Sequence, residues 1–269
     1  KFDLPESPRH FSNQTTKASV DALIKAAETS FDLPIKFYEK KRKILGFKKL
    51  YDYDRYAPLG ESKSVYKFDE CKKIVLETFA KFSPKFGEIA ARAFKEGWID
   101  VYPAENKRGG AFSQSGVAKA HPYVLLNHTD ERQDLFTLAH ELGHAAHQNL
   151  AYESVGFLNA DTPLTTAETA SVFCEMLVFD HVKSTLKGRE KTALLAGKIE
   201  DIFATLYRQI NFTTFERRVH AHDGEISADE LNKIWLEEST KMFSKSVTLN
   251  DYYKIWWSYI PHFKIGRAS

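Results

Sequence analysis

The residues most able to do chemistry lie in one short stretch, "TLAHELGHAAHQ", which spans residues 137–148. If this stretch is helical, His140 and His144 lie about 40° apart around the axis and roughly 6 Å apart along it, so both imidazoles can reach one metal ion. Glu141 then points about 100° away from His140, beside the ion, where it can act as a base on water. HExxH on a helix is typical of zinc metallopeptidases, although three fixed positions also occur together by chance.

A third histidine, His147, lies on the same face of the predicted helix, about 20° from His140 but roughly 10 Å along the axis. One ion cannot easily contact both side chains. We therefore predict that His147 does not bind the ion, and that it either supports a ligand side chain or is structural. The metzincin pattern would place glycine at position 147 and histidine at position 150. The sequence has His147 and Leu150 there, so that pattern is absent and the third ligand must come from another segment.

A second helix, predicted over residues 163–187, can supply that ligand. Glu168 and Glu175 lie seven residues apart on it and share a face, and a buried carboxylate is costly unless it is paired or bound to a metal. We predict Glu168 as the third ligand and Glu175 as the partner that orients a ligand histidine. The alternatives are a solvent-facing charge at Glu168 and a buried hydrogen-bonding residue at Glu175. Two histidines and one glutamate form a catalytic zinc site, so we expect one zinc ion per chain.

The remaining sequence predicts a mainly α-helical chain with a small sheet. Helical patterns cover residues 16–46, 67–83, 84–96, 130–150, 163–187, 190–221 and 227–243. Two short stretches, "RGGAFSQ" and "HPYVLLN", have the composition of strands and can pair beside the HExxH helix. An exposed strand edge can bind an extended peptide as an added strand, and the candidate edge consists of Gly110, Ala111, Phe112 and Ser113. The alternative is an ordinary hairpin that fills a corner.

Composition and charge argue against several classes of protein. The chain has 269 residues, of which 43% are hydrophobic and 13% aromatic, as expected of one large globular domain. The net charge of +2 argues against a nucleic-acid binder, and no apolar run is long enough to span a membrane. Cys71 and Cys174 lie in apolar helical patterns and are predicted to be free buried thiols, consistent with a reducing, cytoplasmic location. Nothing in the sequence predicts an oligomeric state.

The HExxH stretch is part of an ordered series of motifs. "YDYDRYAPL" and "GWIDVYPAENKRGGAFS" precede it, "HPYVLLNHTDERQDLFTLAHELGHAAH" contains it, and "TPLTTAETASVFCE", "YRQINFTTFERRVH" and "WWSYIPHF" follow it. From about residue 15 to Phe263, the series resembles the catalytic domain of the thimet oligopeptidase and oligoendopeptidase F family of gluzincin peptidases. This ordered series is far more specific than HExxH alone.

The resemblance implies a function as well as a fold. It implies zinc bound by His140, His144 and Glu168 in a zincin-like helical domain, with Glu141 as the general base. It further implies hydrolysis of short oligopeptides in a deep helical channel, by Glu-assisted attack of zinc-bound water. It also favours the interpretation of residues 110–113 as a peptide-binding edge. We therefore expect peptides as substrates, and neither nucleic acid nor a membrane as a partner.

The two ends of the chain differ from the family pattern. Family members have a further helical region before the first motif and a tyrosine-rich helix after the "IPHF" equivalent, whereas this chain begins "KFDLPESPRH" and ends "IPHFKIGRAS". The resemblance therefore predicts that residues 1–269 form one zinc-peptidase catalytic domain and a fragment of a longer protein. It also matches His262 to a histidine near the reaction's oxyanion, although a core histidine beside Pro261 is an equal interpretation. Since no tyrosine follows His262, the alternative function is a truncated zinc-binding domain with little or no peptidase activity.

Overall fold

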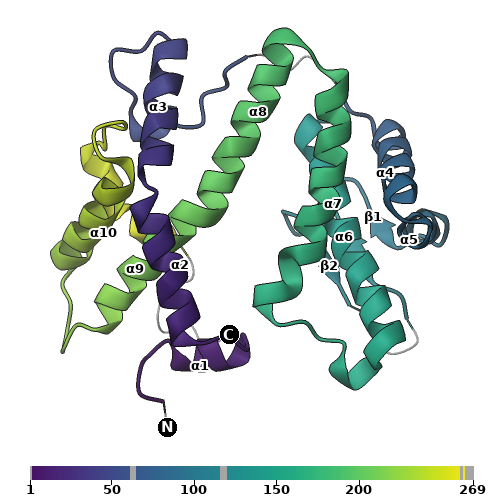
Figure 1. Cartoon of the computed structure of the whole chain (residues 1–269), viewed down its shortest axis with the longest axis horizontal. Coiled ribbons are helices and arrows are strands. Elements are labelled where there is room, and N and C mark those ends of the chain that lie inside the picture. Colours follow the sequence, from purple (N-terminus) through teal and green to yellow (C-terminus); the bar gives the residue numbers. More distant parts are fainter. Residues whose placement is uncertain (1, 61–64, 116–119, 261–262, 264–269) are drawn as a thin grey trace. The chain divides into compact units, whose positions relative to one another are not determined.

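The computed structural model describes residues 2–60, 65–115, 120–260 and 263. These residues form a mainly α-helical protein with one small three-stranded sheet, which confirms the predicted fold class (Figure 1). The chain divides into two compact units. The first unit combines Lys1–Glu61 with Thr192–Ser269, and the second unit is the continuous segment Ser62–Lys191.

The second unit is built around two long helices that lie side by side, α6 (Arg132–Val155) and α7 (Leu164–Thr185) (Figure 1). Two shorter helices, α4 (Phe68–Phe82) and α5 (Pro84–Lys95), pack against them. All four match predicted helical segments, although α6 continues beyond the predicted end at residue 150. A capping box that involves Asp134 fixes the first turn of α6, which explains the acidic start of this segment.

The helices α6 and α7 approach closely at Gly143. A Cβ atom at this position would lie 2.7 Å from Ser171 Cα and 2.9 Å from the Ala170 carbonyl oxygen, both main-chain atoms of α7. Only glycine lets two backbones come this close. Elsewhere along the pair, the Phe136 and Phe179 rings pack with centroids 6.2 Å apart. The two helices that carry the predicted ligands are therefore held at a short spacing.

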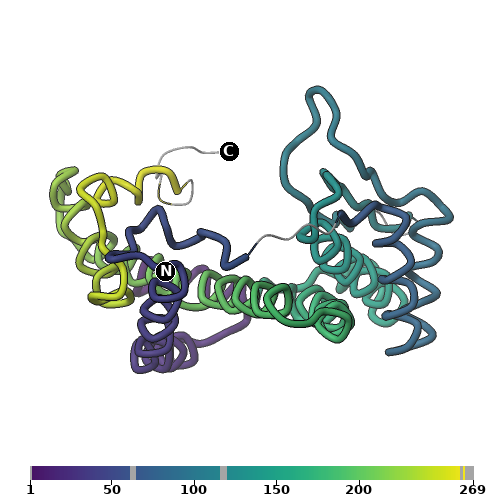
Figure 2. The backbone as a smooth tube through the Cα atoms, turned by 90° about the horizontal axis from the view of Figure 1, so that it is seen from above, coloured from purple at the N-terminus to yellow at the C-terminus, as the bar shows by residue number. Residues whose placement is uncertain are grey.

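The sheet lies next to α6 and has the strand order β1–β3–β2. β2 (Phe112–Gln114) pairs antiparallel with β3 (Tyr123–Leu125), which confirms the predicted pairing of the two short stretches. β1 (Ile99–Asp100) runs parallel to β3 and was not predicted, because two residues are too few to show a strand pattern. β2 is thus an edge strand, and the extended loop that leads from β1 into it is visible in the second unit in Figure 2.

The first unit gathers helices from both segments that form it. Its long helices are α2 (Lys17–Thr29), α3 (Asp32–Ile44), α8 (Gly188–Phe203, which begins in the second unit), α9 (Gln209–His220) and α10 (Ala228–Phe243). Its shorter helical elements are α1 (Ser7–Ser12), η1 (Asp52–Asp54), the π-helical stretch Ala204–Arg208 and η4 (Asp251–Tyr259). The core between them mixes aliphatic and aromatic side chains and includes Tyr38, Phe215, Trp235 and Phe243.

Two predicted long helices in the first unit differ from the structure. The segment 16–46 forms two helices instead of one, because Pro34 has no N–H to donate to the Ser30 carbonyl and its ring would clash with that carbonyl in a continuous helix. The segment 190–221 stays helical, but Ala204–Arg208 widens into a π-helical stretch between α8 and α9.

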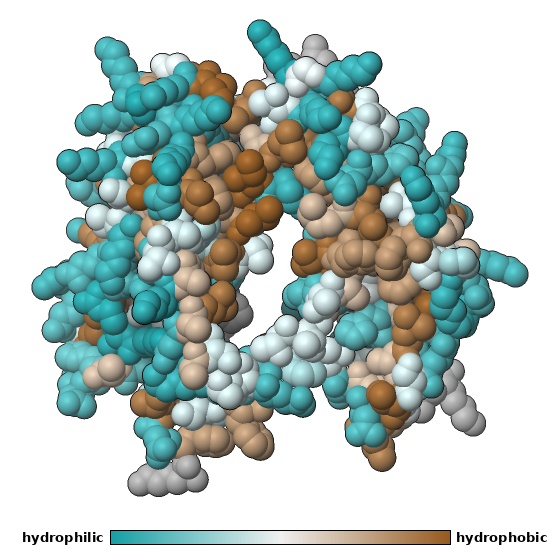
Figure 3. All heavy atoms as spheres, in the orientation of Figure 1, coloured by the Kyte–Doolittle hydropathy of each residue, from teal (hydrophilic) through white to brown (hydrophobic). Residues whose placement is uncertain are grey.

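The surface is mixed in polarity. Large apolar side chains are exposed on both units, for example Phe11 at 77% and Leu158 at 91%. The face shown in Figure 3 carries hydrophobic residues among hydrophilic ones. Over the ranges 2–60, 65–115 and 120–260, no helix is both long and apolar enough to cross a membrane.

Candidate metal centre

The helix α6 holds the two histidines of the HExxH stretch next to each other. The His140 and His144 rings have centroids 4.9 Å apart and planes inclined at 79°. Both side chains are partly buried, with 25% and 17% of their surface exposed. Burial lowers the pKa of His144, which favours the neutral imidazole that a metal ligand requires.

The helix α7 brings Glu168 to both histidines. Its Oε2 atom lies 3.0 Å from His140 Nε2 and 3.3 Å from His144 Nε2. Although 60% of the Glu168 side chain is exposed, its carboxylate points at the histidines rather than away into solvent. The Ser171 hydroxyl donates a 2.7 Å hydrogen bond to the same oxygen and helps to fix this direction.

These three side chains fit a zinc ion. One ligand atom from each lies within 4.8 Å of the others, and no other such group of histidine, cysteine or acidic side chains occurs among the residues that the structure describes. In a tetrahedral site with bonds of about 2.0–2.1 Å, two ligand atoms lie about 3.3–3.4 Å apart. The separations of 3.0 and 3.3 Å from Glu168 to His140 and His144 are close to that spacing. Two imidazole nitrogens and one carboxylate oxygen also leave a fourth position open.

Glu175 lies on the other side of His140 from Glu168. Its Oε2 atom is 3.2 Å from His140 Nδ1, so that a proton on Nδ1 leaves Nε2 free as a ligand atom. Burial would lower the pKa of His140, but the hydrogen bond with Glu175 and the neighbouring carboxylates raise it overall. This is the geometry expected of a carboxylate that orients a ligand histidine.

Glu141 is the most buried acidic side chain at this site, with 7% of the residue exposed. The Ser113 backbone lowers the pKa of Glu141 only slightly, and Glu141 Oε2 has no hydrogen-bond partner in the described part of the chain. Burial raises the pKa of Glu141 to about 7. A carboxyl group with a pKa near neutrality can both accept and release a proton under physiological conditions.

A cavity of about 530 Å³ opens in front of these side chains. Its walls are the edge of β2, the α6 face with Glu141 and His144, the loop before α7, and Glu168 on α7. His147 also lines this cavity but is not one of the three convergent ligand residues. His262, predicted as a second catalytic residue, lies outside the described residues.

Three of the four predicted peptide-binding residues lie along one wall of this cavity. Ala111, Phe112 and Ser113 line it. Gly110 and Ala111 also line a neighbouring cavity of about 310 Å³. Gly110 adopts a φ of +81°, which favours glycine, and the Asn127 amide donates to its carbonyl at 2.8 Å. The start of the edge strand is thus fixed by hydrogen bonding as well as by backbone conformation.

Gln148 was not predicted, but it faces the same cavity. Its Nε2 atom donates to the Ser113 carbonyl at 3.2 Å, and the Ser113 hydroxyl donates to its Oε1 atom at 2.8 Å. The signal in the sequence was its position four residues after His144, which places both on one face of a helix. Without the position of β2, this spacing could not identify its partner.

Comparison with known proteins decides the family. A model of peptidase family M3 matches residues 7–264. The chain belongs to this family. Oligoendopeptidase F, chromosomal, from Lactococcus lactis subsp. cremoris is 30% identical over 266 residues, which cover 97% of this chain and 44% of the relative. Group B oligopeptidase PepB from Streptococcus agalactiae is 30% identical over 247 residues, or 90% of this chain and 41% of that protein. The chain therefore spans less than half the length of these relatives.

Solved structures share the fold of this chain. The crystal structure of a provisionally assigned peptidase from Chlamydophila abortus superimposes with a TM-score of 0.85 at 28% identity, over 99% of this chain and 45% of that chain. Oligoendopeptidase-F from Enterococcus faecium has the same fold, with a TM-score of 0.68 at 21% identity over 98% of this chain and 40% of that chain. The resemblance predicted from the sequence motifs is confirmed.

Proposed function

We propose that residues 1–269 form the zinc-binding catalytic domain of an endopeptidase that hydrolyses short oligopeptides. The observation that carries this proposal is the convergence of His140, His144 and Glu168 from two helices onto one point beside the buried Glu141. Membership of peptidase family M3 and the oligopeptidase names of its relatives support the reaction class.

Each side chain at the centre has a role in this proposal. His140, His144 and Glu168 would hold the ion, and Glu175 would orient His140. When bound, zinc supplies a Lewis acid that polarises the peptide carbonyl and lowers the pKa of water toward about 7. Glu141 takes the proton of the attacking water and then delivers it to the leaving amine.

The same observations support a class of substrate and a cellular location. A peptide in extended form would lie along the β2 edge at residues 110–113, where main-chain hydrogen bonds give a grip that tolerates many sequences. His262 remains the proposed oxyanion donor. The buried free thiols Cys71 and Cys174 support a reducing, cytoplasmic location. We propose no nucleic-acid or membrane partner.

Metal analysis tests the site directly. The chain should bind about one zinc ion, and His144→Ala and Glu168→Ala should each lose it, because three protein ligands define a catalytic zinc site. His147→Ala is the matched control: it removes a histidine that lines the same cavity but is not a ligand, so its zinc content should equal that of the wild type. Full zinc content in both ligand variants would contradict the site.

Cleavage of a quenched fluorescent peptide of roughly eight residues tests the activity. We expect hydrolysis that stops when a chelator removes zinc and returns when zinc is restored. Zinc binding without any hydrolysis would instead favour the alternative of a zinc-binding domain with little or no peptidase activity. That outcome would support the proposed metal site and contradict the proposed endopeptidase function.

A further inference from the structure

The hydroxyl and the carbonyl of Ser113 are both bound by α6. The hydroxyl donates to Gln148 Oε1 at 2.8 Å, and the carbonyl accepts from Gln148 Nε2 at 3.2 Å. Two hydrogen bonds from one planar amide fix both the distance and the rotation of the strand at this residue. Gln148 therefore ties β2 to the helix that also carries Glu141 and two of the predicted zinc ligands.

The register of β2 shows what this tie occupies. Ser113 is opposite Val124 in the antiparallel ladder, and main-chain groups in such a ladder face alternately toward and away from the partner strand. The Ser113 groups face away from β3, because they reach side chains of α6. An extended peptide would add to β2 on this outer side, where it would bond to outward-facing main-chain groups. One of these groups, the Ser113 carbonyl, is already bound to the Gln148 amide.

We propose that Gln148 is a positioning residue for the peptide, an inference that rests on the proposed endopeptidase function. By holding Ser113, it fixes the edge strand relative to Glu141 and so sets where a peptide's scissile bond lies. The peptide then pairs with the main chain of Ala111, which lies two residues before Ser113 and faces the same outer side of β2. Ala111 borders both the 530 Å³ and the 310 Å³ cavities, so a peptide paired there has room on both sides.

Kinetics on four variants test this role. Gln148→Ala removes both hydrogen bonds, and Gln148→Glu keeps the length but has no N–H for the Ser113 carbonyl. Both should lower kcat by about 10–100-fold with a smaller change in KM, because a shift of roughly 1 Å in the bound peptide can cost about 10²-fold in rate. Ser113→Ala loses only the hydroxyl contact, so its kcat should lie between that of the Gln148 variants and that of the wild type.

Asn149→Ala provides the matched control. It removes an amide from the next position of α6, where Asn149 Nδ2 donates to Glu153 at 2.8 Å on the exposed face and not to β2. Its kcat and KM should equal those of the wild type. Ser113→Ala should also add little in the Gln148→Ala background, because the two changes remove one shared contact.

Amide hydrogen exchange gives a readout that does not depend on activity. Exchange of the β2 amides, residues 112–114, should be faster in Gln148→Ala than in Asn149→Ala, while zinc content stays equal. Unchanged exchange, an unchanged kcat, a change confined to KM, or loss of zinc would each overturn the positioning role. If the wild type binds zinc but cleaves no peptide, the endopeptidase proposal and the role toward peptide fail together, and exchange still shows whether Gln148 holds β2.

Discussion

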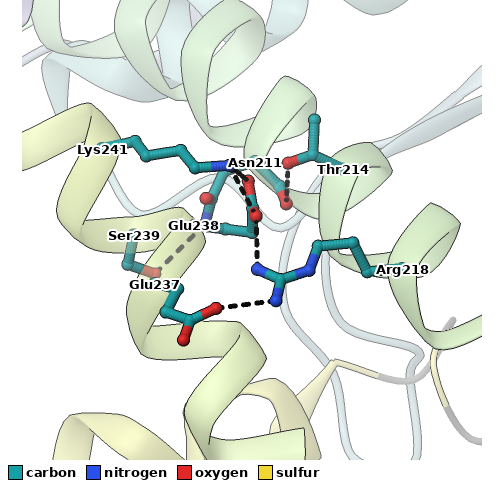
Figure 4. A network of polar contacts seen from close by, with 7 residues as sticks. All are labelled: Asn211, Thr214, Arg218, Glu237, Glu238, Ser239 and Lys241. Atoms are coloured by element: carbon teal, nitrogen blue, oxygen red, sulfur yellow. Dashed lines mark hydrogen bonds and ion pairs between the residues drawn. The ribbon is translucent and has the colours of Figure 1, made fainter.

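Glu238 in the first unit and Glu141 in the second are both buried glutamates on helices, but their surroundings are opposite. Glu238 is 2% exposed and accepts hydrogen bonds from Arg218 at 2.7 Å and from Lys241 at 2.8 and 2.9 Å (Figure 4). Glu141 is 7% exposed, and its Oε2 atom has no partner among the residues described. The carboxylate of Glu238 is thus saturated with hydrogen-bond donors, whereas the carboxylate of Glu141 is unsaturated because one of its oxygens has no donor among the residues described.

The pKa directions follow from this difference. Burial alone would raise the pKa of Glu238, but the hydrogen bonds from Lys241 and Arg218 outweigh burial and hold its pKa below the ordinary value. Burial at Glu141 is offset only in part, by His140 and the Ser113 backbone, and its pKa rises to about 7. A saturated carboxylate stabilises the packing of α9 and α10, whereas an unsaturated one beside three convergent ligands is available for proton transfer.

The largest expected effect comes from Glu141→Gln. It should lower the peptidase rate by about 10²–10⁴-fold or more, the scale of general base catalysis, because an amide cannot accept the proton of water. Zinc content should stay at the wild-type level, since residue 141 points beside the ion. Stability should not fall, because Glu141 Oε2 has no donor to lose. Zinc loss in this variant, with retention in Glu168→Ala, would mean that the two roles are exchanged.

Gly143→Ala should break the geometry of the metal site without changing any ligand. Its new methyl group would meet the main chain of α7 at 2.7 Å and push apart the helices that carry His140 and Glu168. We expect destabilisation of about 1–3 kcal/mol, as for overpacked cores, and a loss of zinc affinity of at least about 10-fold.

Gly87→Ala is the control for that change, because its methyl group would meet Ala80 Cα at 2.8 Å, between α5 and α4. It should destabilise by a similar amount and leave zinc affinity unchanged. Denaturant unfolding and zinc titration of the two variants would separate these effects. Equal zinc affinity in both would show that the α6–α7 spacing does not set the site.

These outcomes also explain how far the sequence could predict the site. Helical periodicity places His140, His144 and Glu141 correctly relative to one another, because all three lie on one element with fixed geometry. Glu168 required a guess about a second helix, and its exposure of 60% shows why burial alone could not identify it. Gln148 was missed because its partner Ser113 lies on a strand, and no periodicity links the two.

The fold, like the site, could be predicted from the sequence only within single elements. Long helices were predicted nearly to their ends, because their apolar faces repeat over many residues. The break at Ser30 was missed because the apolar pattern continues across it, although Pro34, four residues later, is a signal for it in the sequence. β1 was missed, because a two-residue strand is defined by its neighbour β3 and not by its own pattern. Local sequence patterns therefore predict the long helices, whereas features that depend on contacts between elements, such as β1, cannot be predicted from them.

Glu238→Gln should affect stability and leave the metal site alone. Because the folded-state pKa of Glu238 is depressed, its contribution to stability is present above the unfolded value near 4.5 and is lost as pH falls through the folded pKa. The variant should be roughly 1–2 kcal/mol less stable at pH 7, a modest value since Arg218 and Lys241 are partly exposed. Unfolding measured at pH 7 and in steps below about 4.5 should show the difference shrinking. A constant difference would contradict the charge-based role.

The smallest effect concerns two glycines with open space around them, one in each unit. No atom lies within 4 Å of a Cβ placed on either Gly197 or Gly156. Gly197 lies inside α8 with an ordinary helical backbone, so Gly197→Ala should stabilise by about 0.4–1 kcal/mol by restricting the unfolded chain. Gly156 ends α6 with a φ of +75°, so Gly156→Ala should destabilise the chain despite the free space. Thermal unfolding of both variants under one buffer would show opposite changes in Tm. Changes of the same sign would mean that the backbone conformation at these positions does not decide the outcome.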